Sequence, residues 1–164
     1  LDPSTFSKYW PHGYHFGVGV EEAIGKAGQA HAGFLVWHHR MPLQSDKMLE
    51  DQHASPDITI EGGTVSITEI LASFRFDLTA TRIRPYVLAG LGAGVLAASD
   101  TTISSPTTSR STSIDTEVDF GLTAGIGVRG DLGGASIFCQ VRYGTVFTEG
   151  DRTNYVPVTV GVAF

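Results

Sequence analysis

Apolar and polar residues alternate along most of this chain, and the alternation is clearest over residues 118–132. Successive side chains point to opposite faces of a β-strand, so a period of two predicts strands. In this segment one face is apolar, while the other consists of glycine and polar residues. The apolar face carries Val118, Phe120, Leu122, Ala124, Ile126 and Val128.

The same pattern predicts seven strands, and no segment shows a convincing helical period. The strands run over about 14–24, 30–43, 63–78, 84–98, 117–131, 135–148 and 155–164. Strands in globular proteins are usually about 5–6 residues long, whereas a tilted strand needs about 9–11 residues to cross a bilayer. Every predicted strand reaches that length, so strand length favours a membrane protein.

The connections between the predicted strands alternate between short and long. The short turns are 25–29, 79–83 and 132–134, and the long segments are 44–62, 99–116 and 149–154. In an up-and-down sheet all short turns then lie at one end, as the periplasmic turns of outer-membrane barrels do. We therefore expect one all-β domain over 1–164, with a loop at 1–13 and seven strands of an antiparallel transmembrane-type β-barrel over 14–164.

Composition indicates which face of this barrel lies outside. Charged residues are 17% of the chain, below the roughly 25% of an ordinary soluble domain, and glycines recur opposite the apolar face. Charges share the glycine face, and inside a narrow barrel they must pair to offset their desolvation. We expect a polar network in the lumen made of Glu69, Arg75, Asp77, Asp119, Arg129, Gln140 and Arg142.

Two details of this network can be predicted. Arg129 and Arg142 lie on adjacent strands at similar heights above the 132–134 turn, so at least one of them is expected to pair with Glu69, Asp77 or Asp119. The interior of an eight-stranded barrel is just wide enough to be filled by side chains. A packed, salt-bridged interior is therefore favoured over a conducting pore.

Four segments also resemble a known family. RPYVLAGLGAGV, FGLTAGIGVRGDLGG, FCQVRYGTVFTEG and YVPVTVGVAF are similar to the last four strands of small bacterial outer-membrane β-barrel proteins of the OmpA-like barrel superfamily. The resemblance is good over 83–164 and fainter over 14–78. It implies an eight-stranded barrel whose first strand is missing from these residues. It also implies that Phe164 belongs to the signal read by the barrel-insertion machinery.

The missing strand has a defined place in such a barrel. It would lie between the strands at 14–24 and 155–164 and hydrogen-bond to both, because unpaired backbone groups are costly in lipid. We expect upstream residues of the same polypeptide to supply it, or else a strand from another copy. The second arrangement would produce a polymer.

Other motifs in the sequence give little support to a catalytic, nucleotide-binding or metal-binding function. The sequence GIGVRG at 125–130 matches a dinucleotide pattern by its letters, but it lies inside a predicted strand and no helix follows it. The Ser- and Thr-rich segment 99–113 is expected to be a flexible surface loop. Solvated or interfacial positions are favoured over a metal site for His12, His15, His31, His38, His39 and His53.

Three functions remain open at this point. The favoured one is a non-catalytic outer-membrane barrel without a cofactor, which has a structural or surface-interaction role and whose partners are the lipid bilayer and the barrel-insertion machinery. The alternatives are a subunit of an extracellular filament or tube built by strand pairing between copies, and a soluble barrel that binds a small apolar ligand. The net charge of −6 argues against a nucleic-acid partner.

Overall fold

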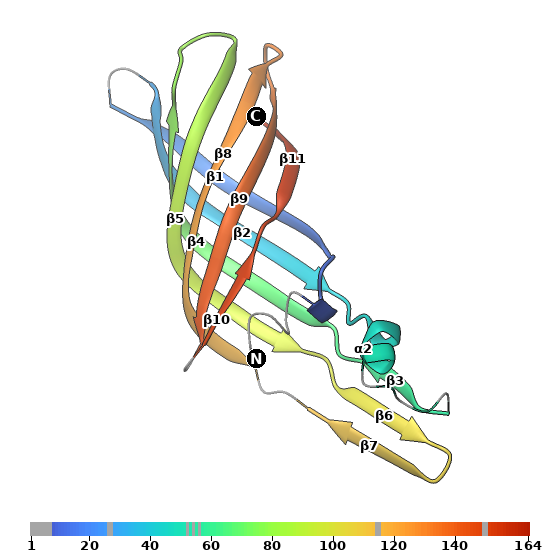
Figure 1. Ribbon diagram of the computed structural model, residues 1–164. Coiled ribbons are helices and arrows are strands. Elements are labelled where there is room, and N and C mark those ends of the chain that lie inside the picture. Colours follow the sequence, from blue (N-terminus) through green and yellow to red (C-terminus); the bar gives the residue numbers. More distant parts are fainter. Residues whose placement is uncertain are drawn as a thin grey trace.

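The computed structural model describes residues 8–25, 28–51, 53, 55, 57–113, 116–148 and 151–164. Most of them form one curled antiparallel sheet (Figure 1). Its strands are β1 (Tyr14–Ile24), β2 (Ala30–Met41), β4 (Val65–Asp77), β5 (Ile83–Ala98), β8 (Glu117–Asp131), β9 (Ser136–Thr148), β10 (Asp151–Tyr155) and β11 (Val158–Ala163). The all-β, antiparallel fold expected from the two-residue period is thus confirmed.

The strand boundaries agree closely with the sequence pattern, except at the last strand. The strand predicted at 155–164 begins earlier and is divided into β10 and β11, which pair with successive parts of β9. The division falls at Val156 and Pro157, because proline has no N–H to give to the ladder. The carbonyl of Pro157 still accepts a hydrogen bond from the Arg142 N–H at 3.1 Å. β10 and β11 therefore occupy a single edge of the sheet.

The sheet is open between its two edges. The strand order is β1-β2-β4-β5-β8-β9, with β10 and β11 sharing the last position, and every neighbouring pair is antiparallel. Six antiparallel steps leave β1 and β11 running in the same direction. No ladder joins β1 to β10 or β11 among the described residues, so the sheet curls and stays open at the place where the sequence predicted a further strand. We call this gap the seam.

The two faces of the sheet differ sharply in composition and burial. Along β4, Ile67, Glu69 and Leu71 are buried on the concave face, whereas Ile70 and Phe74 are exposed on the convex face. β8 follows the expected facing, since Leu122 lies on the exposed face and Thr123 is buried. Charges therefore lie inside, and many large apolar side chains lie outside, which is unlike a soluble protein.

An apolar cluster fills the concave face near the long connections. Met41, Val65, Ile67 and Val146 form this cluster, and Trp10 packs against it. The indole N–H of Trp10 donates to the Gly63 carbonyl at 2.8 Å. These contacts close the inner face at this end with packed side chains.

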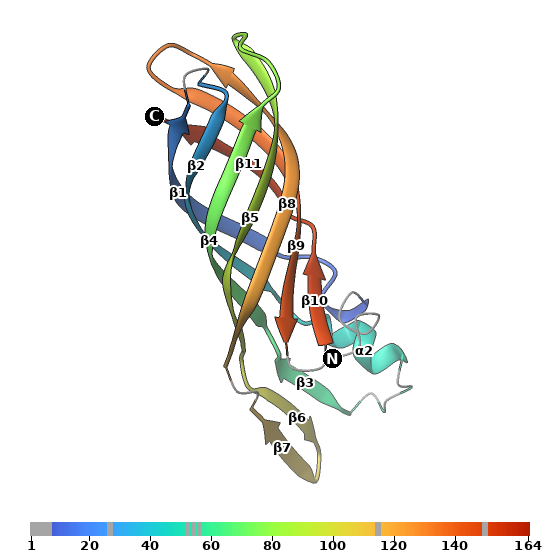
Figure 2. The same cartoon turned by 90° about the vertical axis from the view of Figure 1, so that its left-hand side faces the viewer.

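The long connections contain structure that the sequence pattern did not predict. β3 (Thr59–Gly62), β6 (Thr101–Ser105) and β7 (Thr108–Thr112) form a separate three-stranded sheet, and α2 (Ser45–Asp51) is a short helix. Figure 2 shows this small sheet projecting beyond one end of the main sheet. The expected flexible loop at 99–113 is thus wrong, because hydroxyl side chains pair across β6 and β7.

The helix α2 went unrecognised because seven residues make barely two turns, too few to show a period of 3.6. Lys8 contacts its last residue, with 2.8 Å between Lys8 Nζ and Asp51 Oδ2. The hydrogen bond from Lys8 holds the pKa of the Asp51 carboxyl below its ordinary value. Among the described residues, no helix is long and apolar enough to cross a membrane.

The narrow interior predicts that some inner glycines cannot be replaced. A Cβ at Gly127 would overlap the Tyr86 ring and approach the Cys139 carbonyl. Gly127→Ala should lower the free energy of unfolding by about 1–3 kcal/mol, as overpacking does. Gly134→Ala is the matched control, because a Cβ there meets no atom within 4 Å. Equal denaturation midpoints for the two variants would contradict the packing described here.

Candidate functional site: the polar network inside the sheet

One cluster of charges fills the concave face near the short turns. Arg75 contacts Glu21 with Nη1–Oε2 at 2.8 Å and Asp77 with Nε–Oδ1 at 3.1 Å. Arg84 lies 3.6 Å from Asp77 between Nη1 and Oδ2, and it also binds both carboxylate oxygens of Asp131. Asp77 is 1% exposed, so its charge depends on these arginines for compensation.

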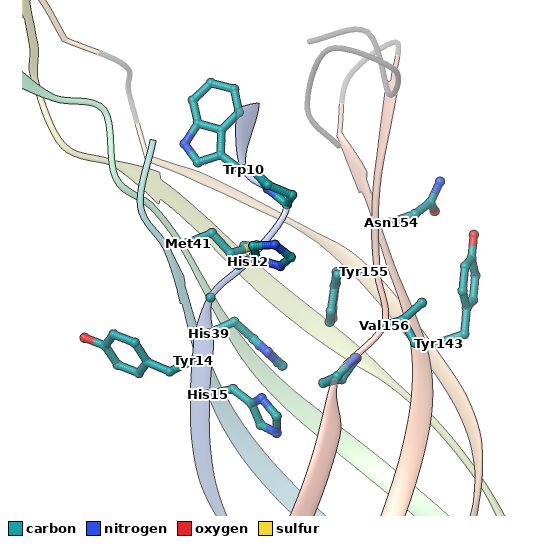
Figure 3. Close-up of a pocket in the computed structure, with 13 residues that line it drawn as sticks. Trp10, His12, Tyr14, His15, His39, Met41, Tyr143, Asn154, Tyr155 and Val156 are labelled. Carbon is teal, nitrogen blue, oxygen red and sulfur yellow. The ribbon is translucent and has the colours of Figure 1, made fainter. Parts of the chain in front are cut away.

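A second cluster surrounds Glu69 nearer the long connections. Glu69 is fully buried, and its Oε2 lies 3.1 Å from Nε2 of the buried His39. The rings of His15 and Tyr155 pack against His39 with centroid distances of 5.3 and 4.8 Å. Figure 3 shows His15 and His39 directed toward Tyr155, whereas Tyr14 and Tyr143 point away from this space. The cluster thus joins β1, β2, β4 and β10.

Arg142 and Gln140 project from β9 into the same interior. The Arg142 guanidinium lies over the Trp37 ring at 4.2 Å from the ring centroid, although β9 and β2 are not neighbours in the sheet. The Tyr86 hydroxyl donates to Gln140 Oε1 at 3.0 Å. These contacts cross the concave space and link opposite walls of the curled sheet.

Two cavities border the seam. One, of about 370 Å³, lies near the long connections and is lined by residues that include His15, His39 and Tyr155. The other, of about 660 Å³, extends toward the short turns and is lined from β1 by residues 17–21 and from the opposite edge by residues 162–164. The His15 side chain spans the seam to Thr159, with 2.8 Å between Nε2 and Oγ1.

The contacts of His15, His39 and Glu69 show how these polar side chains pack across the interior. His15 bonds the Thr159 hydroxyl, but the buried carboxylate of Glu69 contacts a different imidazole, that of His39, so these groups do not form a Ser-His-Asp type relay. In the part of the chain that the structure describes, no group of three or more His, Cys, Asp or Glu side chains could hold a metal ion. GIGVRG lies inside β8, away from any helix.

The predicted network residues all lie on the concave face. Glu69, Arg75, Asp77, Gln140 and Arg142 are buried, and Asp119 and Arg129 are partly buried. The predicted pairing of Arg129 or Arg142 with Glu69, Asp77 or Asp119 is wrong for the described residues. Arg129 instead lies 4.0 Å from Asp131, between Nε and Oδ1, and Arg142 packs on Trp37 without an ion pair within 4.0 Å.

The reason is the register of β8 and β9. Arg129 pairs with Phe138, whereas Arg142 pairs with Gly125, so the two arginines lie four residues apart along the strands. They are therefore not at the similar heights that the sequence suggested. Arg142 reaches the Trp37 ring across the interior, while Arg129 remains beside the turn and its nearest acid is on its own strand.

The sequence analysis missed several members of the network. Glu21 and His39 are in phase with the inner positions of β1 and β2, so their period-two placement could have identified them. The expectation of solvated or interfacial histidines is wrong for His39, which is 4% exposed. His38, its neighbour, lies on the other face and bonds the Thr68 hydroxyl at 2.9 Å.

Comparisons with known proteins give no further guidance. The chain matches no protein-family model, no curated protein and no solved structure. The resemblance to OmpA-like barrels is therefore a hypothesis that rests on the quoted segments. Phe164 is fully exposed directly after β11, and its role in barrel insertion remains a prediction.

The charge cluster predicts unequal roles for two aspartates that contact the same arginine. Asp77→Asn should lower the free energy of unfolding by up to about 3–5 kcal/mol, because it removes the buried carboxylate that Arg75 and Arg84 share. Each arginine then keeps only its more exposed partner, Glu21 or Asp131. Asp131→Asn is the control and should have a much smaller effect, since the Asp131 side chain is 36% exposed. Denaturation followed by circular dichroism in the same detergent measures both. Equal losses would contradict the account of the buried cluster.

Proposed function

We propose that this chain is an outer-membrane β-barrel protein with a structural or surface-interaction role. The observation that carries the proposal is the inverted distribution of residues. Large apolar side chains such as Phe34 on β2, Leu91 on β5 and Ile126 on β8 are exposed on the convex face, while most charges of these strands are enclosed. An exposed apolar face over several strands is unfavourable in water. Lipid is the solvent that makes this distribution favourable.

One border of the apolar face supports the same proposal. On β2 and β4 the convex face becomes polar toward the long connections, where it carries His38, Arg40 and Thr68. Toward the short turns it stays apolar, and Ile24 and Phe76 are exposed there. A broad apolar face that ends at a polar margin fits a bilayer. With the short turns on the periplasmic side, as in outer-membrane barrels, the small sheet of β3, β6 and β7 lies outside the cell.

The seam needs one further strand in a bilayer. Both edges carry backbone groups that pair with no other strand in the described part of the chain, and each such group costs several kcal/mol in lipid. Direct pairing of β1 with β11 would be parallel, because both strands run from the long connections to the short turns. A single strand running the opposite way is antiparallel to both edges and gives the even strand number of bacterial barrels. Its inward side chains would project into both cavities, so we assign neither cavity to a ligand.

The unpaired edges also favour one alternative, a self-assembling extracellular filament. Exposed strand edges can join neighbouring molecules, and β1 and β11 leave two such edges free among the described residues. Two copies in the same membrane orientation would again meet through parallel strands, so this alternative requires assembly outside a bilayer. The soluble apolar-ligand barrel is disfavoured, because the enclosed face carries charges beside its apolar cluster.

A charge on the convex face tests the membrane proposal. Leu122→Arg should lower the free energy of unfolding in lipid vesicles by about 2–4 kcal/mol, because it moves a cation into the apolar band. Thr108→Arg on the exposed β7 is the control and should change it by less than about 0.5 kcal/mol. Denaturant titration in vesicles gives both values.

Two results would contradict the proposal. The first is that Leu122→Arg is as stable in vesicles as Thr108→Arg. The second is that the wild-type chain is absent from the membrane fraction. Sedimentation of the wild-type chain without lipid or detergent as regular polymers would favour the filament instead.

Cross-linking tests the additional strand. Phe16 and Val160 lie one residue beyond the His15–Thr159 contact on the two edges, and both are exposed. With one strand between them their backbones would be about 9.6 Å apart, beyond the roughly 7 Å limit of a disulfide. In a Cys139→Ser background, Phe16→Cys with Val160→Cys should react with a bifunctional reagent of about that length in native membranes. Direct disulfide formation between them would contradict the additional strand.

A further inference from the structure

The hairpin of β6 and β7 ends in an exposed strand. All five residues of β7 are exposed, and β7 is the last strand of the small sheet, whose order is β3-β6-β7. Its outer edge pairs with no described strand. β-sheet edges in soluble surroundings are usually blunted by proline, bulges or charges. β7 has a single charge, Arg110, and neither of the other protections.

Several hydroxyl groups of the hairpin bond to one another across its two strands. Thr102 donates to Ser111 at 3.4 Å, and Ser104 and Ser109 are 3.1 Å apart between hydroxyl oxygens. These side chains form a ladder across the two strands. The ladder stabilises the hairpin, so the binding capacity that remains free is the backbone of β7.

The register shows which backbone groups are free. β6 and β7 are joined by a two-residue turn that places Ser105 opposite Thr108. In such a hairpin Thr108, Arg110 and Thr112 exchange hydrogen bonds with β6, and the residues between them direct their N–H and C=O outward. Ser109 and Ser111 therefore present a row of backbone donors and acceptors that fits an added strand.

Arg110 selects the partner. It stands opposite Ile103 and has no ion pair among the described residues. Antiparallel pairing of two β7 strands about their centres would place Arg110 opposite Arg110, and like charges directly opposite are destabilising. A strand with an acidic residue at that position would be stabilised instead. Charge complementarity thus favours a different protein over a second copy.

We propose that β7 is a docking edge for an extended segment of another protein that carries an acidic residue opposite Arg110. The proposal deepens the surface-interaction role and rests on the orientation in which the small sheet lies outside the cell. Its backbone contacts supply affinity, and the Arg110 contact supplies selectivity and a dependence on salt.

Peptide binding to the detergent-solubilised chain tests this edge. The probes are fluorescein-labelled peptides of sequence TVTETVT and TVTKTVT, and fluorescence anisotropy is the measurement. The glutamate peptide should bind up to about fivefold tighter at low salt, and Arg110→Glu should reverse that preference. Ser109→Pro should abolish binding because it removes an outward N–H, whereas Ser109→Ala retains the N–H, loses only the hydroxyl contact with Ser104, and should still bind the peptide with the same preference.

The possible outcomes distinguish peptide binding at the β7 edge from peptide binding elsewhere on the chain. Equal binding to Ser109→Pro and Ser109→Ala would place the peptide elsewhere, such as the seam, and would overturn the proposal. Absence of binding, or an unchanged preference in Arg110→Glu, would overturn it as well. Circular dichroism confirms that the variants keep the fold. Because binding is measured without a bilayer, it is independent of whether the chain inserts into membranes.

Discussion

Compensation of the buried Asp77 charge is the constraint on which the interior depends. Asp77 contacts Arg75 and Arg84, Arg75 extends the contacts to Glu21, and His31 approaches Asp77 at 3.5 Å. These side chains come from the four neighbouring strands β1, β2, β4 and β5, so the charges are compensated only in the observed register of these strands. An ion pair in such surroundings contributes little net stability, but its disruption is costly. The network therefore specifies one register more than it strengthens the fold.

The apolar convex face accompanies the enclosed charges, because the two faces alternate along each strand. A soluble barrel would bury Leu122 and Phe74 and hydrate Asp77, whereas this chain does the opposite. The interior is then too narrow for large side chains at every position, which explains why glycine at 127 faces the Tyr86 ring. The tight packing inside, the charge compensation and the apolar exterior all follow from one sheet whose polar face is enclosed and whose apolar face is exposed. They account for the proposal of a membrane barrel better than any individual motif does.

Sequence periodicity predicted the strands and their facing because both follow from a two-residue repeat that each strand carries by itself. The boundaries of β1 and β8 and the burial of Glu69 and Asp77 were predictable for this reason. Contacts across the interior were not predictable, since Arg142 meets Trp37 through the curl of the sheet and its register. The hairpin at β7 was missed because its Ser and Thr residues lack an apolar alternation.

Site-directed spin labelling along β8 in lipid vesicles tests the central claim most directly. A nitroxide placed singly at positions 118–128, in a chain without Cys139, reports access to lipid-soluble oxygen and to a water-soluble nickel complex. The account predicts oxygen access with a period of two, highest at Phe120, Leu122, Ala124 and Ile126, and little access of nickel at those positions. Equal access of nickel to both faces, or oxygen access centred on Thr123, would contradict the assignment of the apolar face to lipid.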